Sequence, residues 1–209
     1  MKISKSAVTY ILFAILAFFM LQLALGETFT SLLLLNSEKV LTWPWILLTH
    51  MFLHGSLNHL LFNAYGIFLF GTILEERIGS KRLLLIYIVS GIIAGFFSSF
   101  FYHYSLGASA GLMALIGVLI VLMPNLQLLL FFFVPMPLWM AGIIWAAIDV
   151  FGILFPGGVA NIAHLIGLGI GIAYGLYLKG KKNEYMKRFA AKSHLDKGDI
   201  EDYIKTGRI

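Results

Sequence analysis

Six apolar runs, each close to the length needed to cross a membrane, constrain this fold more than any other feature of the sequence. A transmembrane helix needs roughly 20 mostly apolar residues. The runs cover residues 7–25, 47–74, 83–101, 108–123, 138–155 and 159–178. The chain is 60% hydrophobic and only 12% charged, which no soluble domain of ordinary composition matches. We therefore predict an all-α polytopic membrane protein, a bundle of six transmembrane helices.

The connecting segments divide the chain further. Residues 26–44 form a long connection with amphipathic or re-entrant content at 32–35, and 75–82 is a short charged turn. Residues 128–134 are apolar but too short to span, so we expect a re-entrant or interfacial piece. The first run is long for a signal-peptide core and is followed by a weak cleavage site, so we expect it to be kept. We predict a membrane domain at 1–182 and a cytoplasmic polar tail at 183–209.

The basic residues predict the orientation in the membrane. With six spans both termini lie on one side, and of the 15 Lys and Arg residues only Lys39 falls on the other. Basic loops stay in the cytoplasm, so we expect a multi-pass protein of the cell membrane with both termini cytoplasmic. The formal charge of +5 thus reports topology and predicts no nucleic-acid partner. The chain has no cysteine, which excludes disulfides and thiolate chemistry.

Polar residues that are unusual for membrane helices occur in the second, fourth and sixth spans. His59 and Asn63 lie on the second, Ser109 begins the fourth, and His164 lies early in the sixth. All three spans enter from the extracytoplasmic side, so these groups share a similar depth. Ionisable groups inside a membrane usually face the bundle interior and mark function. We therefore expect a single pocket near that face.

Small residues indicate which helices meet. Ala163, Gly167, Gly171 and Gly175 recur every four residues on the sixth span, and Gly107 and Gly111 do so around the start of the fourth. Such spacing lets two helix backbones approach closely. If these seams face each other, His164 comes within reach of Ser109. A serine in a membrane helix otherwise packs or bonds to its own backbone, so its interpretation as a nucleophile depends on His164.

These motifs together resemble the rhomboid family of intramembrane serine proteases. The stretch 107–110 is similar to the family's GxSx nucleophile motif, and 163–171 to its AHxxGxxxG pattern. His54, His59 and Asn63 match its HxxxxHxxxN pattern, and 74–79 its charged turn. The matches occur in family order. Two positions depart from it: Ala110 stands where Gly is frequent, and Met113 where Tyr is frequent.

The resemblance implies a Ser–His dyad. Ser109 would attack the scissile carbonyl, and His164 would serve as general base and then as acid. Asn63 and His59 would stabilise the oxyanion with the serine's backbone N–H. The remaining motif residues, expected to be structural near the site, are His54, which would bond to the first loop, and Gly107 and Gly167.

The predicted function is therefore an intramembrane serine endopeptidase that acts through an acyl-enzyme near the extracytoplasmic surface. Its partners would be the lipid bilayer and single-span transmembrane substrate proteins, with no cofactor and no oligomeric state assigned. Two other classes stay open: a catalytically silent relative that binds transmembrane clients, and a small transporter. An internal inverted repeat, typical of transporters, is not evident.

Two further sets of polar residues lie in the predicted second and fifth spans. The histidines at 50, 54 and 59 suggest a metal site, but on one helix His50 and His59 would point in opposite directions, so we predict no metal. Asp149 lies in the fifth span. We expect it to be a packed or hydrogen-bonded group of that span rather than a partner of His164.

Overall fold

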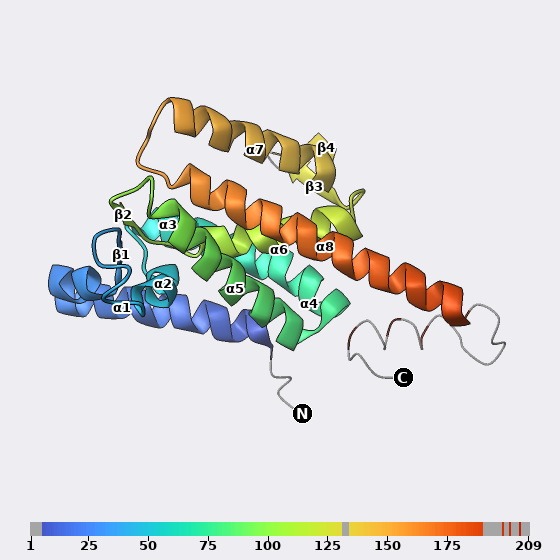
Figure 1. Ribbon diagram of the computed structural model, residues 1–209, viewed down its shortest axis with the longest axis horizontal. Coiled ribbons are helices and arrows are strands. Elements are labelled where there is room, and N and C mark those ends of the chain that lie inside the picture. The colour runs from blue at the N-terminus through green and yellow to red at the C-terminus, as the bar shows by residue number, and fades with distance from the viewer. Residues whose placement is uncertain (1–5, 131–133, 190–197, 199–200, 202–204, 206–209) are drawn as a thin grey trace.

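The chain folds as a helical membrane bundle (Figure 1). The computed structural model describes residues 6–130, 134–189, 198, 201 and 205. Its α-helices are α1 (Ala7–Leu33), α2 (Ile46–Thr49), α3 (Leu57–Gly66), α4 (Thr72–Ile78), α5 (Ser80–Ser98), α6 (Ser109–Leu122), α7 (Leu138–Leu154) and α8 (Asn161–Phe189). A short 3-10 turn, η1 (His50–Phe52), follows α2, and a π-helical segment, η2 (Ile67–Gly71), joins α3 to α4 without a break.

Four helices are long and apolar enough to cross a membrane: Ala7–Leu33, Leu57–Ile78, Ser80–Ser98 and Asn161–Glu184. The predicted fourth and fifth spans form shorter apolar helices, α6 and α7. At 1.5 Å per residue α6 is about 21 Å long, whereas the hydrocarbon layer is about 30 Å thick. One end of α6 must therefore lie within the membrane. The structure thus has the predicted helical membrane architecture, with one central helix that is too short to reach both surfaces.

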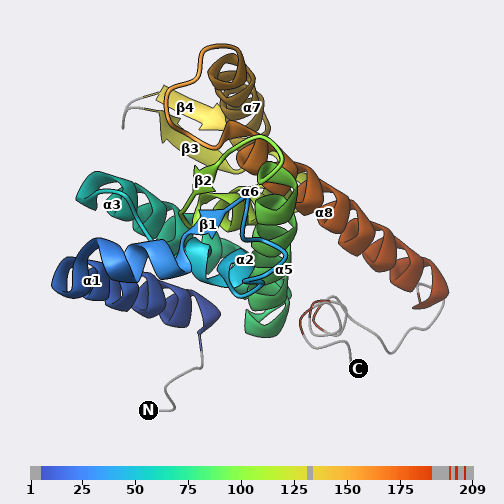
Figure 2. The same ribbon diagram turned by 60° about the vertical axis from the view of Figure 1, so that its left-hand side comes forward.

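Helix α6 lies in the middle of the bundle, as both ribbon views show (Figures 1 and 2). Nine of its residues are buried, namely the stretch from Ala110 to Leu119 with the exception of Leu112. Helices α5 and α8 pack on it, and α7 lies on the outside of the bundle against α8 and α6. The helix that begins with Ser109 is thus the one on which α5, α7 and α8 pack.

The connection after the first span is more ordered than predicted. Helix α1 continues to Leu33 and kinks at Gly26, whose φ of 70° is accessible mainly to glycine. The chain then forms β1 (Leu35–Asn36), which pairs antiparallel with β2 (Tyr104–Ser105). Leu35 is opposite Ser105 in this pairing. The first connection is therefore tied to the segment that leads into α6.

The predicted second span begins too early in the sequence. Residues 46–52 form α2 and η1, the chain is extended at Leu53, and the spanning helix starts only at Leu57. Ser56 is its N-cap and accepts a hydrogen bond from the His59 N–H. A serine side chain that bonds to a nearby backbone N–H is unfavourable inside a helix and favourable at its N-cap, so it marks the start of the helix. His50 and His54 therefore precede this span and do not share a helix with His59.

The apolar segment after α6 is a β-hairpin rather than a re-entrant piece. Strands β3 (Gln127–Leu130) and β4 (Val134–Pro137) pair antiparallel, with Gln127 opposite Pro137. The hairpin connects α6 to α7 at the end of the bundle where α1 begins (Figure 1). Residues 131–133, which would connect the two strands, lie outside the described part.

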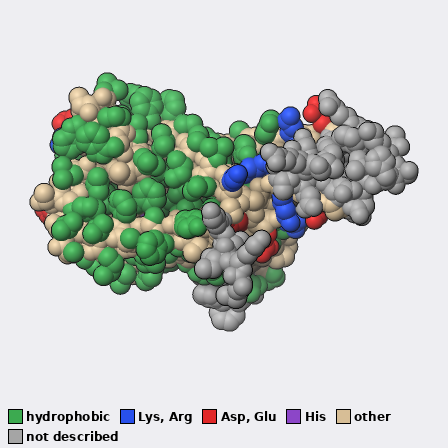
Figure 3. All heavy atoms as spheres, turned by 90° about the horizontal axis from the view of Figure 1, so that it is seen from below, with side chains coloured by type: hydrophobic (Ala, Val, Ile, Leu, Met, Phe, Trp, Pro, Cys, Tyr) green, Lys and Arg blue, Asp and Glu red, His purple; other side chains and the backbone are tan. Residues whose placement is uncertain are grey.

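The charged groups gather at one end. In Figure 1 the start of α1 and the end of α8 point to the same side. Figure 3 shows a broad hydrophobic surface over the bundle, with Lys and Arg side chains toward one end. Glu75 in α4 ties down the start of α1, since its carboxylate accepts hydrogen bonds from the Ser6 hydroxyl and the Ala7 N–H. Helix α8 runs without a break past residue 182 to Phe189, and most of the predicted tail lies outside the described residues.

Candidate active site

The seam between α6 and α8 is made of glycines in contact with backbone. A Cβ added at Gly167 would overlap the carbonyl oxygen of Ala110, and one added at Gly171 would overlap that of Ala114. From the other side, a Cβ at Gly117 would lie 2.9 Å from the Ile172 nitrogen. Neither helix can carry a side chain here, and this is what lets the two backbones touch. The predicted seam is present, and it fixes the relative position of the two helices.

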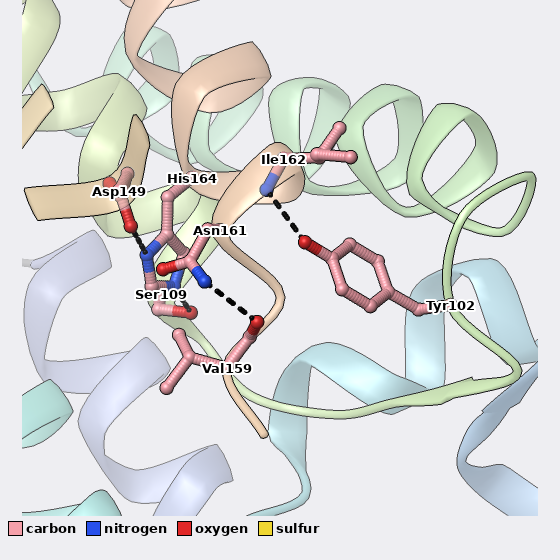
Figure 4. A network of polar contacts seen from close by, with 7 residues as sticks. All are labelled: Tyr102, Ser109, Asp149, Val159, Asn161, Ile162 and His164. Carbon is pink, nitrogen blue, oxygen red and sulfur yellow. Dashed lines mark hydrogen bonds and ion pairs between the residues drawn. The ribbon is translucent and has the colours of Figure 1, made fainter. Parts of the chain in front are cut away.

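Ser109 and His164 meet at the end of this seam where both helices begin. The Ser109 Oγ lies 2.7 Å from the His164 Nε2 (Figure 4). Ser109 is the first residue of α6, and His164 lies one turn into α8, which begins at Asn161. Both side chains are partly buried. A hydroxyl and an imidazole from two different helices are thus within direct hydrogen-bond distance.

Asp149 reaches His164 as well, which corrects our expectation that it would serve only its own span. Its Oδ1 lies 2.9 Å from the His164 Nδ1 (Figure 4). A carboxylate can only accept, so the Nδ1 must carry the proton, and the neutral ring then accepts from Ser109 at Nε2. Sequence reasoning missed this contact because nothing in a local pattern says which face of α7 meets α8. A buried carboxylate in an otherwise apolar helix was the available signal.

Position 107 requires a glycine because of its backbone conformation and its close neighbours. Its φ is 129°, a value that side chains rarely allow. A Cβ there would lie 2.8 Å from the His59 Cε1 and 3.8 Å from the Ser109 Oγ. The Gly107 N–H donates to the His50 carbonyl oxygen at 2.9 Å. The turn before α6 is therefore fixed to the η1 segment, and it brings the His59 ring and the Ser109 hydroxyl to one place.

Asn63 is buried one turn after His59 in α3, and its side-chain amide already donates one hydrogen bond. The Asn63 Nδ2 donates to the His59 carbonyl oxygen at 2.9 Å, four residues earlier in the same helix. An amide nitrogen has two protons, so one remains for another acceptor. Four residues apart, Asn63 and His59 lie on the same face of α3, and the His59 ring and the Ser109 Oγ both lie beside the position that a Cβ of residue 107 would take.

His54 differs from its predicted contact. We expected its side chain to bond to the first loop, but both ring nitrogens are buried without a hydrogen-bond partner among the described residues. Its backbone N–H donates instead to the Gln22 side chain of α1. Burial, reinforced by the nearby His59, lowers the pKa of His54 to about 4. His54 is thus a neutral packing residue whose ring centroid lies 5.0 Å from that of His59.

The histidines that suggested a metal are placed differently from the single helix assumed for them. The His50 Nδ1 lies 2.9 Å from the Ile46 carbonyl oxygen, in its own turn of helix. Within the described residues, no three His, Asp or Glu side chains come together as a metal-binding group. His50 is thus bonded to backbone, whereas the rings of His54 and His59 lie against each other edge to face.

The loop between α7 and α8 closes over the start of α8. The Tyr102 hydroxyl accepts a hydrogen bond from the Ile162 N–H at 3.2 Å, and the Asn161 amide donates to the Val159 carbonyl oxygen at 3.1 Å (Figure 4). By contrast, a Cβ at Gly157 or Gly158 would meet nothing within 4 Å. The end of the loop is therefore anchored beside His164, while its middle is loosely packed.

Fold and site together define the class: a helical membrane bundle with a hydroxyl, an imidazole and a carboxylate in a hydrogen-bonded series near one end. Residues 42–181 match the family described as Rhomboid domain. The chain therefore belongs to the rhomboid family.

Relatives with curated names include the Rhomboid protease GlpG of Yersinia pestis (strain Pestoides F) and that of Yersinia pseudotuberculosis serotype O:3 (strain YPIII). Each is 33% identical to this chain over 141 residues, which are 66% of this chain and 48% of the relative. The protein of the same name from Yersinia enterocolitica serotype O:8 matches to the same extent. The chain thus spans about half the length of the curated relatives it matches.

Proposed function

We propose that this protein is an intramembrane serine endopeptidase in which Ser109 is the nucleophile and His164 the general base. The observation that carries the proposal is the 2.7 Å separation of the Ser109 Oγ and the His164 Nε2. A serine hydroxyl is a weak nucleophile until an adjacent base takes its proton. Membership of the rhomboid family and similarity to proteins named as rhomboid proteases support the same activity.

The reaction follows from these two groups. Ser109 Oγ forms a bond to the scissile carbonyl carbon as its proton passes to His164 Nε2. When the tetrahedral intermediate collapses, the C–N bond breaks and the imidazolium gives that proton to the leaving amine. A water molecule then attacks the acyl-enzyme ester and gives a proton to His164, which returns it to Ser109 as the ester C–O bond breaks.

The oxyanion of the tetrahedral intermediate needs donors that are already in place. Ser109 begins α6, so the first N–H groups of that helix have no acceptor within it and carry the positive end of its dipole. We assign the Ser109 N–H, the second amide proton of Asn63 and the His59 ring to this role. One such donor is worth roughly 3–4 kcal/mol of transition-state stabilisation.

The substrates would be single-span transmembrane proteins cut below the membrane surface. Because α6 is about 9 Å shorter than the hydrocarbon layer is thick, Ser109 lies at a depth that a soluble protein does not enter. Water must reach the acyl-enzyme, and the loosely packed loop around Gly157 and Gly158 is placed to act as a movable cap. A substrate helix must unwind before its peptide bond can be attacked, so unwinding would limit the rate as much as chemistry.

A cleavage assay in proteoliposomes tests the activity. Wild-type protein should cut a single-span substrate and react with a serine-directed fluorophosphonate, whereas Ser109→Ala should do neither. Ser105→Ala, changed four residues earlier in β2, is the matched control and should retain both. Equal cleavage by Ser109→Ala would refute the proposal. So would labelling at a residue other than Ser109.

We further propose that both termini face the cytoplasm, so that the site opens to the opposite side. The cysteine-free chain allows single cysteines to be introduced without background. In intact cells an impermeant maleimide should label Gly157→Cys, in the loop beside the site. Lys182→Cys, toward the end of α8, should react only after the cells are permeabilised. The reverse pattern would invert the topology and leave the chemistry of the site unaffected.

A further inference from the structure

Asp149 lies on the face of α7 that docks onto the bundle. Gly142 and Gly152, at seven residues before it and three after, mark that face: a Cβ at Gly142 would overlap the Ile120 side chain, and one at Gly152 would lie 2.5 Å from the Asn161 Nδ2. Seven and three residues both return a helix to nearly the same side. The carboxylate therefore projects inward between two close contacts and not toward lipid.

The surroundings of Asp149 leave it one polar partner in the described structure. The residue is 5% exposed and is the only carboxylate among the buried polar residues of the described part. Its only hydrogen bond there is to the His164 Nδ1, at 2.9 Å. A carboxylate is costly inside a membrane unless it is paired. An apolar residue would pack on this face of α7 at lower cost, so packing alone does not account for an acid here.

We propose that Asp149 is a positioning residue for His164, so that the site works as a Ser–His–Asp triad. This inference rests on the proposed protease function. The carboxylate accepts the Nδ1 proton, which leaves the Nε2 lone pair directed at Ser109. It also stabilises the imidazolium that forms when His164 takes the serine proton. Because Asp149 belongs to α7, the triad is complete only while α7 is docked on α8.

A positioning role and a purely structural role of Asp149 predict different effects of replacing this residue. If Asp149 only held α7 in place, any change that disturbs α7 packing would lower activity to a similar degree. If it positions His164, the loss follows the carboxylate itself. Gly142→Ala is the matched control, because it disturbs the same face of α7 two turns away, near Ile120, without touching the imidazole.

The experiment measures cleavage kinetics and the rate of fluorophosphonate labelling of Ser109 in proteoliposomes for five proteins. These are wild type, Asp149→Asn, Asp149→Leu, Asp149→Glu and Gly142→Ala. Asp149→Asn should lower kcat by roughly 10²- to 10⁴-fold, with KM within about threefold, and should slow labelling in parallel. Asp149→Glu, which keeps the charge, should regain at least tenfold of that loss.

Stability is measured on the same samples by thermal unfolding. Asp149→Leu removes the carboxylate and leaves the His164 Nδ1–H without its acceptor, so it should unfold somewhat earlier than wild type and should label as slowly as Asp149→Asn. Gly142→Ala should keep kcat within about fivefold of wild type. Labelling of stable Asp149→Asn or Asp149→Leu at the wild-type rate would overturn the inference. An equal loss in Gly142→Ala would also do so.

These outcomes are distinct from a failure of the proposed function. If wild-type cleavage requires Ser109 and Asp149→Asn is fully active, the protease stands and only the positioning role falls. If wild-type protein neither cleaves nor labels, both fall together.

Discussion

Helices α6 and α7 both pack against α8, but they do so by different means. Between α6 and α8 the contacts are backbone against backbone, at Gly167, Gly171 and Gly117. Between α7 and the bundle they are side chains that fill the space over Gly142 and Gly152, together with the bond from Asp149 to His164. At these three glycines the nearest atoms are backbone, which no change of rotamer can move aside, whereas the α7 interface is made of side chains that can move.

This difference separates two tasks at the site. The rigid α6–α8 seam holds Ser109 against His164, so the distance between the Ser109 Oγ and the His164 Nε2 is set by packed backbone. The α7 interface brings in the carboxylate through side chains. The pairing of serine and histidine should therefore resist perturbation of α7 and should fail when the α6–α8 seam is opened. Four changes test this, beginning with the largest expected effect.

Gly167→Val should do the most damage. The new side chain would meet the Ala110 carbonyl oxygen, which cannot move without shifting α6, and overpacking of this kind costs about 1–3 kcal/mol or more. Because the strain lies one turn from His164, we expect labelling of Ser109 to fall by at least about 10³-fold. Thermal unfolding and fluorophosphonate labelling measure the two effects.

Gly169→Val, on the same helix, is the control. A Cβ at Gly169 meets nothing within 4 Å, so this variant should unfold and label as wild type does. If the two variants behaved alike, the seam would not be what sets the distance between serine and histidine.

Gly107→Ala should have the next largest effect. The residue has a φ of 129° and faces the His59 ring, so alanine adds both backbone strain, of order 1–3 kcal/mol, and a clash beside Ser109. We expect a loss of roughly 10- to 100-fold in kcat/KM. Gly157→Ala, in open space and at an ordinary φ, should stay within about twofold, and a similar loss there would argue against a special role for Gly107.

A pH titration tests the segment that leads into α3, which belongs to neither interface. His54 is buried without a ring partner in the described structure, and its pKa is lowered to about 4 from 6.5. Since the unfolded chain takes up the proton first, this residue's contribution to stability is present above pH 6.5 and is lost as the pH falls toward 4. His54→Phe should flatten the fall of the unfolding temperature over this range. An unchanged pH dependence in that variant would show that His54 does not titrate as inferred.

Gly142→Ala should have the smallest effect. The added methyl meets the end of the Ile120 side chain, which can adopt another rotamer, and alanine favours a helix over glycine by roughly 1 kcal/mol. These terms oppose each other, so we expect the free energy of unfolding to change by less than about 1 kcal/mol. A loss as large as that of Gly167→Val would mean that α7 is held as rigidly as α6.

The sequence predicted those parts of the fold that depend on local composition. Helices α5 and α7 begin and end within three residues of the apolar runs that predicted them. The boundaries were wrong where the conformation or side chain of a single residue outweighs hydropathy. Ser56 caps α3 and so delays the second span to Leu57, and Gly26 kinks α1 instead of ending it. The β3–β4 hairpin was missed because an apolar run of this length favours strand and membrane-inserted segments alike.

For the site, the residue spacing predicted that His164 comes within reach of Ser109 if the two small-residue seams face each other, and the family resemblance implied the dyad. A repeat of small residues every four positions marks one face of a helix, and the family motifs added Asn63, His59 and Gly107. Three features became evident only once the helices were docked: the His54 ring has no hydrogen-bond partner among the described residues, Asn63 bonds to the His59 carbonyl oxygen, and Asp149 reaches His164. The physical reason is range. Periodicity fixes which residues share a face of one helix, whereas a contact between α7 and α8 depends on how two helices dock, and a lone acid in an apolar span does not reveal that.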